Sequence, residues 1–301
     1  MGTCVMSFRS AAALVALAVA GCQSDRIVVG SKNFSEQVTL GEIIAQSIES
    51  TGRHVTRRLN LGGTFVCDRA IRAGEIDVYV EYTGTAHSAI LKLPPVNDRE
   101  KVLEEVSRRY AEAGLDLLLP LGFENTFAMV VRADDAARLP LRTISDLAAH
   151  PELRAAVGYE FMERADGFPG LARTYGIALA EPPRVMELGL LYRALVDRQA
   201  DFVAGNSTDG QIASLHLRIL EDDKRYFPPY DAVPVVRQAA LVRYPELRAA
   251  IAPLGGRISM DEMRRLNSLV DGGKATAEEA ARELLTRLGT EAPRPPAGAP
   301  P

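Results

Sequence analysis

Asp77–Thr85, with the sequence DVYVEYTGT, is the stretch that decides the fold. Asp77–Glu81 alternates as a short strand, and a glycine-containing turn leads into a helix predicted at Thr85–Leu91. Open α/β sheets bind ligands where strand ends lead into helix N-termini. The ring of Tyr82 would attract a cation, and the hydroxyl of Thr85 beside free helix amides would attract an anion. The segment suits a zwitterion with a quaternary ammonium, although taken alone it also describes an ordinary strand–turn–helix.

Strand and helix patterns alternate along the rest of the chain. Repeated βα units predict an α/β protein with two mostly parallel sheets covered by helices, and a cleft between two such lobes is a common ligand site. The predicted strands are Ile27–Val29, His54–Leu59, Asp77–Glu81, Asn125–Arg132, Ala155–Tyr159, Arg184–Leu188, Asp201–Gly205 and Val233–Arg237.

The first 22 residues read as a targeting segment instead of part of the fold. Arg9 gives a small positive region, and Ala11–Ala20 is an apolar run too short to span a bilayer but typical of a signal-peptide core. The run leads through small residues to Cys22, which resembles the bacterial lipobox, where the cysteine is lipidated. The alternative is an ordinary signal peptide in which Cys22 is incidental.

Composition indicates a soluble, globular mature protein. Hydrophobic residues make up 47% and charged residues 25% of the 301 residues, and the net charge of -4 argues against a nucleic-acid partner. Cys67 lies in an apolar-periodic stretch and is expected to be a small buried side chain. The Pro/Ala-rich tail 290–301 (TEAPRPPAGAPP) is expected to be disordered.

Four further turns follow predicted strands and carry polar or small residues. Lys32 lies in Gly30–Gln37 (GSKNFSEQ), Arg164 lies in Glu160–Gly167, and either cation could hold a carboxylate. Gly62–Thr64 permits close backbone approach, and Asn206–Gly210 offers capping side chains. Each turn alone is commonly a simple cap, but together they predict one site shared by two lobes.

No catalytic or metal-binding set stands out. The four histidines are scattered without metal-ligand spacing, and no G-x-S-x-G elbow is present. A phosphate-binding glycine loop is also missing from the sequence. The sequence therefore predicts neither a metal, nor a cofactor, nor an enzyme. The histidines are His54, His87, His150 and His216.

The motifs together resemble one family, the osmoprotectant substrate-binding proteins of ABC importers of the ProX/OpuC type. Those proteins bind glycine betaine, choline, carnitine or proline betaine. The resemblance implies a two-lobed periplasmic-binding-protein fold of type II with two crossovers, with a first lobe of 26–130 plus 232–289 and a second lobe of 131–231. It runs in order through 27–289 and rests on GSKNFSEQ (30–37), LGGT (61–64), GEIDVYVEYTGTA (74–86), LGFENTF (121–127), residues 160–170, STDG (207–210) and LEDDKRYFPPYDAVPVV (220–236).

The resemblance also implies a ligand site in the cleft. An aromatic cage around the ammonium group matches Tyr82, Phe127 and Tyr230, and the anionic end matches Lys32, Thr85 and Arg164. Two positions depart from the family pattern. Phe127 stands where a tyrosine is usual, and Asn206 stands where another aromatic or a polar wall residue is expected. Glycine betaine is the leading ligand, with another onium compound or an aromatic betaine such as ergothioneine as alternatives.

The same resemblance implies the partners and the place of the protein. It would be a monomeric, extracytoplasmic protein, in the periplasm or at the cell surface, held at the membrane by lipid on Cys22. It would deliver a small zwitterionic or cationic ligand to an ABC permease with its ATPase. Two alternatives from other classes are a lipoprotein enzyme on this fold and a sensory binding subunit that does not transport.

Overall fold

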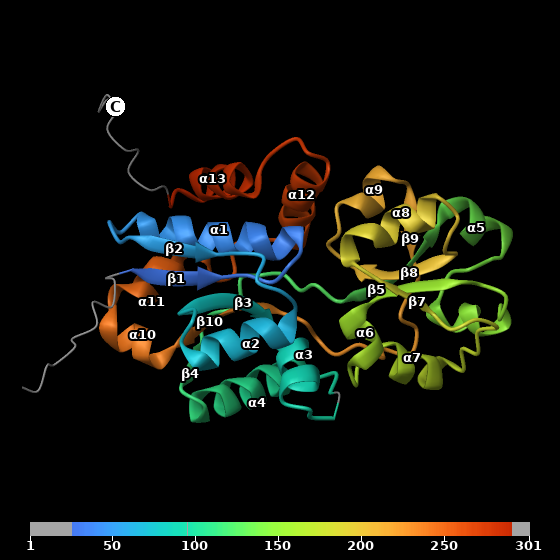
Figure 1. Cartoon of the computed structure of the whole chain (residues 1–301), viewed down its shortest axis with the longest axis horizontal. Coiled ribbons are helices and arrows are strands. Elements are labelled where there is room, and N and C mark those ends of the chain that lie inside the picture. Colours follow the sequence, from blue (N-terminus) through green and yellow to red (C-terminus); the bar gives the residue numbers. More distant parts are fainter. Residues whose placement is uncertain (1–25, 95, 291–301) are drawn as a thin grey trace, which may run out of the picture.

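The computed structural model describes residues 26–94 and 96–290, which form two lobes side by side (Figure 1). The expected targeting segment with Cys22 lies outside the described residues, as does the expected tail beyond Thr290. Within these described ranges, no helix is long and apolar enough to cross a membrane.

The first lobe is built on a five-stranded sheet with the order β2-β1-β3-β10-β4. β1 (Ile27–Gly30) pairs in parallel with β2 (Val55–Arg58) and with β3 (Val78–Tyr82). β10 (Ala232–Arg237) runs antiparallel between β3 and β4 (Leu115–Leu117). All five residues of β3 are buried, as expected for a central strand with helices on both faces.

Helices cover both faces of this sheet, with α1 and α13 on one side and α2 and α4 on the other (Figure 1). β3 serves both cores, because Val78 and Val80 pack toward α1 whereas Tyr79 packs with Cys67 near α2. Cys67 is fully buried, as the sequence predicts. The helices of this lobe are α1 (Ser35–Glu49), α2 (Thr64–Ala73), α3 (Thr83–Thr85), α4 (Arg99–Glu112), α10 (Gln238–Arg243), α11 (Glu246–Ile251), α12 (Met260–Asp271) and α13 (Ala277–Leu288).

The second lobe repeats this plan around a sheet with the order β7-β6-β8-β5-β9. Its three parallel strands β7, β6 and β8 are followed by β5, which runs antiparallel to both β8 and β9. The strands are β5 (Phe127–Arg132), β6 (Ala155–Gly158), β7 (Arg184–Met186), β8 (Phe202–Asn206) and β9 (Leu217–Ile219). The helices are α5 (Ala133–Arg138), α6 (Tyr159–Glu163), α7 (Phe168–Tyr175), α8 (Leu191–Val196) and α9 (Gln211–Ser214).

One strand in each sheet is reversed, and in both lobes it is the strand that arrives from the other lobe. β5 enters the second lobe after β4, and β10 re-enters the first lobe after β9. The other four strands of each five-stranded sheet share one direction, since β10 is antiparallel to both of its neighbours and so is β5. The predicted α/β fold with mostly parallel sheets and two crossovers is therefore confirmed. The boundary predicted after residue 130 falls inside β5, so the first crossover ends before Phe127.

Thr83 and Gly84, which belong to the stretch Asp77–Thr85, contact the second crossover. The helix after β3 begins at Thr83, two residues before the predicted start. Thr83 Oγ1 donates to the carbonyl of Pro229 at 3.1 Å and accepts from the backbone N–H of Asp231 at 3.0 Å. A Cβ on Gly84 would lie 2.6 Å from the Pro229 oxygen and 2.7 Å from the ring of Tyr230, so this close approach requires glycine.

Candidate ligand-binding cleft

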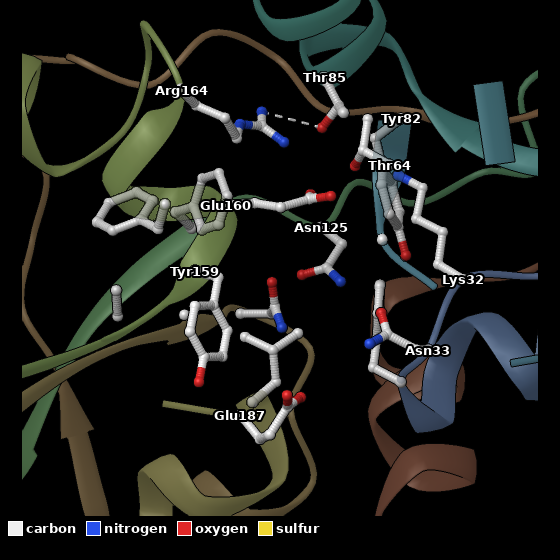
Figure 2. A pocket seen from close by; sticks show the side chains of 18 of the residues that line it. Lys32, Asn33, Thr64, Tyr82, Thr85, Asn125, Tyr159, Glu160, Arg164 and Glu187 are labelled. Carbon is white, nitrogen blue, oxygen red and sulfur yellow. Dashed lines mark hydrogen bonds between the residues drawn. The ribbon is translucent and has the colours of Figure 1, made fainter. Parts of the chain in front are cut away.

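A cavity of about 220 Å³ lies between the lobes and is lined by both of them (Figure 2). The structure brings all seven residues predicted for the site to this one cavity: Lys32, Tyr82, Thr85, Phe127, Arg164, Asn206 and Tyr230. Further lining residues that the sequence reasoning did not assign include Phe34, Asn125, Tyr159, Glu160, Phe161 and Glu187. The volume is below the roughly 300–1,000 Å³ of pockets for drug-sized ligands, so the cavity suits a small molecule.

The elements explain why these residues meet. Lys32 follows β1, Tyr82 ends β3 and Asn206 ends β8, so three strand ends lead to the cleft. The carboxyl ends of parallel strands lie at one edge of a sheet, which is where open α/β folds place ligands. The two crossovers add Asn125 and Tyr230, and the backbone N–H of Asn125 donates to the carbonyl of Tyr230 at 3.0 Å.

Lys32 is buried and forms an ion pair with Glu81. Glu81 is fully buried and also accepts from the backbone N–H of Tyr82 at 2.7 Å and the hydroxyl of Tyr79 at 3.2 Å. Burial raises the pKa of Glu81, although Lys32 acts in the opposite direction. The Lys32 Nζ lies 5.1 Å from the centroid of the Tyr82 ring. Lys32, which was predicted to bind the anionic end of the ligand, is thus already paired with a carboxylate of the protein.

Arg164 is paired in the same way. It donates to both oxygens of Asp166, at 2.8 Å from Nε and 2.6 Å from Nη2, and to Thr85 Oγ1 of the first lobe at 3.2 Å. Asp166 also accepts from the hydroxyl of Tyr230 at 2.6 Å. Burial acts to lower the pKa of Arg164, but Asp166 more than offsets it, and the pKa lies above its ordinary value. The guanidinium carbon lies 4.9 Å from the centroid of the Phe127 ring.

Aromatic rings form much of the cavity wall. Phe127 lies 5.9 Å from Tyr230 at an interplanar angle of 84° and 4.6 Å from Phe161, measured between ring centroids. On the first lobe, Phe34 stacks on Tyr82 with centroids 6.5 Å apart. The three rings predicted as a cage thus belong to a larger aromatic lining. The motifs that contain Phe34 and Phe161 were visible in the sequence, but nothing in their spacing identified these rings as wall residues.

A buried carboxylate lies behind the ring of Tyr82. Glu36 accepts four hydrogen bonds: from the Tyr82 hydroxyl at 2.6 Å, Asn125 Nδ2 at 2.9 Å, Thr208 Oγ1 at 2.5 Å and Asn267 Nδ2 at 2.7 Å. Thr208 belongs to the second lobe, and Tyr82 and Asn267 belong to the first. Burial raises the pKa of Glu36, and each of the four donors acts to lower it. Glu36 therefore links two residues of the cleft wall, Tyr82 and Asn125, to side chains of both lobes.

Asn206, which departs from the family pattern, is held by Asp209. The backbone N–H of Asn206 donates to Asp209 Oδ2 at 2.8 Å, and the hydroxyl of Tyr192 donates to the same oxygen at 2.6 Å. Burial raises the pKa of Asp209 to about 6. Asn206 also pairs with Phe127 across β8 and β5, so an amide and a ring lie next to each other on the cavity wall.

No group of three or more His, Cys, Asp or Glu side chains is arranged to hold a metal ion among residues 26–94 and 96–290. The two cationic side chains that line the cleft, Lys32 and Arg164, are each paired with a buried carboxylate. This arrangement suits recognition of a small ligand by rings and hydrogen bonds.

The two-lobed fold and the cavity between its lobes define a binding protein for a small molecule. The chain belongs to the family of substrate-binding domains of ABC-type glycine betaine transport systems, whose model matches residues 25–287.

The chain is also similar to individual proteins. The chain is 35% identical to the carnitine transport binding protein OpuCC of Listeria monocytogenes over 89% of this chain and 88% of that protein. It is 33% identical to the ergothioneine transport permease/ergothioneine binding protein EgtU of Helicobacter pylori, over 87% of this chain and 48% of that longer protein. A crystal structure titled as a glycine betaine/carnitine/choline ABC transporter is 32% identical and superposes with a TM-score of 0.72, covering 88% of this chain and 99% of that one.

Proposed function

We propose that the cleft captures a quaternary-ammonium compound and that the chain delivers it to an ABC permease and its ATPase. The observation that carries this proposal is that a cavity lined by aromatic rings also has more carboxylates than cationic side chains in and next to its wall. Two cationic side chains, Lys32 and Arg164, are each paired with a buried carboxylate. Glu160 and Glu187 add two more carboxylates to the lining. Rings and a net negative charge together favour a large, weakly hydrated cation.

Glycine betaine, the ligand that the sequence favours, illustrates how the cleft would hold a member of this class. Tyr82, Phe127 and Tyr230 would enclose the trimethylammonium group, at about 0.5–2 kcal/mol for each ring. The carboxylate would accept from Lys32, Thr85 and Arg164, whose Nη1 makes no hydrogen bond to any described residue. Carnitine and ergothioneine are alternatives, because relatives of 35% and 33% identity carry those ligands in their names.

Calorimetry with methylated and unmethylated ligands tests this proposal. Glycine betaine and glycine share the carboxylate and differ only in the three methyl groups on nitrogen. The mature protein should bind glycine betaine at least about a hundredfold tighter, since only the methylated cation fills an aromatic cage. Carnitine, choline and ergothioneine complete the panel. Equal affinity for glycine, or no binding of any quaternary ammonium compound, would overturn the proposal.

We also propose that the mature protein is monomeric, extracytoplasmic and attached to the membrane by lipid at Cys22. The apolar run Ala11–Ala20 and the small residues before Cys22 support this anchor. Mass spectrometry of membrane-extracted protein should find Cys22 as a modified N-terminal residue. A mature chain that begins at unmodified Gln23, or at Met1, would contradict the proposed anchor.

A further inference from the structure

Glu160 occupies an unusual place in the cleft. It is the second residue of α6, directly after β6 ends at Gly158. Figure 2 shows its carboxylate pointing from the second lobe into the pocket, below Thr85 and above Asn125. A Cβ on Gly63 of the first lobe would lie 2.0 Å from Glu160 Oε1, so the glycine leaves the space that this side chain occupies. Glu160 therefore reaches from the second lobe across the cavity to the first lobe.

Its hydrogen-bonding capacity is also unused. Glu81 accepts from Lys32, Tyr79 and the Tyr82 backbone, and Asp166 accepts from Arg164 and Tyr230. The Glu36 carboxylate has the four donors described above. The Glu160 carboxylate, in contrast, makes no hydrogen bond and no ion pair with any residue in the described part of the chain, and only the backbone carbonyl of Glu160 has a partner, the N–H of Arg164 at 3.0 Å.

We propose that Glu160 determines specificity by accepting a hydrogen bond from a hydroxyl or N–H group of the ligand, while the aromatic rings hold its ammonium group. The proposal rests on the function proposed above and ranks the ligands within it: quaternary-ammonium compounds that carry such a donor should bind tighter than glycine betaine, which carries none. A carboxylate accepts but does not donate, and its hydrogen bonds are roughly twice as strong as those between neutral groups. A ligand without a donor would displace water from Glu160 and leave the carboxylate unpaired. Sites of this kind reject analogues that lack the hydrogen-bonding group.

Two pairs of ligands that differ by one hydroxyl isolate this interaction. Choline is compared with ethyltrimethylammonium, and carnitine with 3-deoxycarnitine, by calorimetry on the mature protein. The wild type should bind the hydroxylated member of each pair about 10–100-fold tighter. Glu160→Leu should bring the ratio close to one, because no acceptor remains. Glu160→Gln should give an intermediate ratio, because its amide oxygen still accepts but carries no charge.

Glu163→Gln is the matched control, since Glu163 lies on the same helix but is exposed and does not line the cavity. Its ratio should equal that of the wild type. Thermal unfolding of each variant shows whether the fold is kept, and Glu160→Gln preserves the shape of the side chain if Glu160→Leu does not fold. A wild-type ratio near one, or an unchanged ratio in Glu160→Leu and Glu160→Gln, would overturn the role of Glu160.

The same data separate the two proposals. If both members of a pair bind the wild type with similar affinity, the quaternary-ammonium function stands and only the assignment to Glu160 fails. If no member of either pair binds and glycine betaine also fails to bind, the proposed function falls, and the role of Glu160 falls with it.

Discussion

Replacing Glu36 by alanine should destabilise the protein strongly. The substitution removes the acceptor of four donors and leaves Tyr82, Asn125, Thr208 and Asn267 without this partner. Each unsatisfied buried donor costs about 1–3 kcal/mol. Water entering the vacated space would satisfy some of them, and removing a buried charge offsets part of the loss. We therefore expect a loss of about 3–5 kcal/mol in the free energy of unfolding.

Urea denaturation followed by circular dichroism measures this loss. Glu104→Ala is the control, because Glu104 is exposed on α4, and it should change the stability by less than about 0.5 kcal/mol. Glu36→Gln should lie between the two, since one oxygen is replaced by an amide that faces donors. A loss below about 1 kcal/mol in Glu36→Ala would refute the inference that this carboxylate holds the cleft wall and both lobes together.

Further measurements address the cage, the buried pair and the pH dependence. Tyr82→Ala should weaken glycine betaine about tenfold, whereas Tyr82→Phe keeps the ring and should lower affinity less than about threefold; equal losses in calorimetry would instead implicate the hydroxyl. Arg164→Met should lower the free energy of unfolding by about 3–5 kcal/mol, because the buried charge of Asp166 loses its ion-pair partner and keeps only the Tyr230 hydroxyl; adding Asp166→Asn should restore part of this loss, and simple additivity in urea denaturation would contradict this. The pKa of Asp209 rises from 3.8 to about 6 on folding, so the folded state retains the proton longer. Its contribution to stability should fall by about 2–3 kcal/mol between pH 4 and pH 6, and Asp209→Asn should remove that slope; parallel pH profiles of the two proteins would contradict the assignment.

The sequence predicted that the site residues would meet, because the place where they meet follows from the direction of the strands. Lys32, Tyr82 and Asn206 each follow or end a strand of a parallel set, and parallel strands bring such residues to one edge. Turn chemistry was less informative. The turn Gly30–Gln37 leads into α1, but Phe34 occupies the N-cap position of that helix and no side chain caps it. The predicted boundary after residue 130 lies within β5, because an apolar strand carries no mark of the lobe to which it belongs.

The partners of the site residues could not be predicted, because they depend on distant parts of the chain. The donors to Glu36 lie 46, 89, 172 and 231 positions away. Glu81 was visible beside Tyr82, but its pairing with Lys32 spans 49 positions. In the sequence, Glu160 was visible only as part of a motif. Its place in the cavity depends on the space left by Gly63 on the opposite lobe. Periodicity describes elements, whereas these contacts arise only when two lobes close on each other.

The reversed strands determine the order in which this chain is able to fold. β4 pairs only with β10 in the sheet, and β10 is formed by residues 232–237, after the whole second lobe. A chain emerging from its N-terminus therefore exposes the edges of β3 and β4 until nearly four-fifths of its 301 residues are available. Unpaired edges of this kind invite pairing with other chains. The first lobe is complete only when the chain returns to it, so an N-terminal fragment that ends before β10 should aggregate instead of forming half of the molecule.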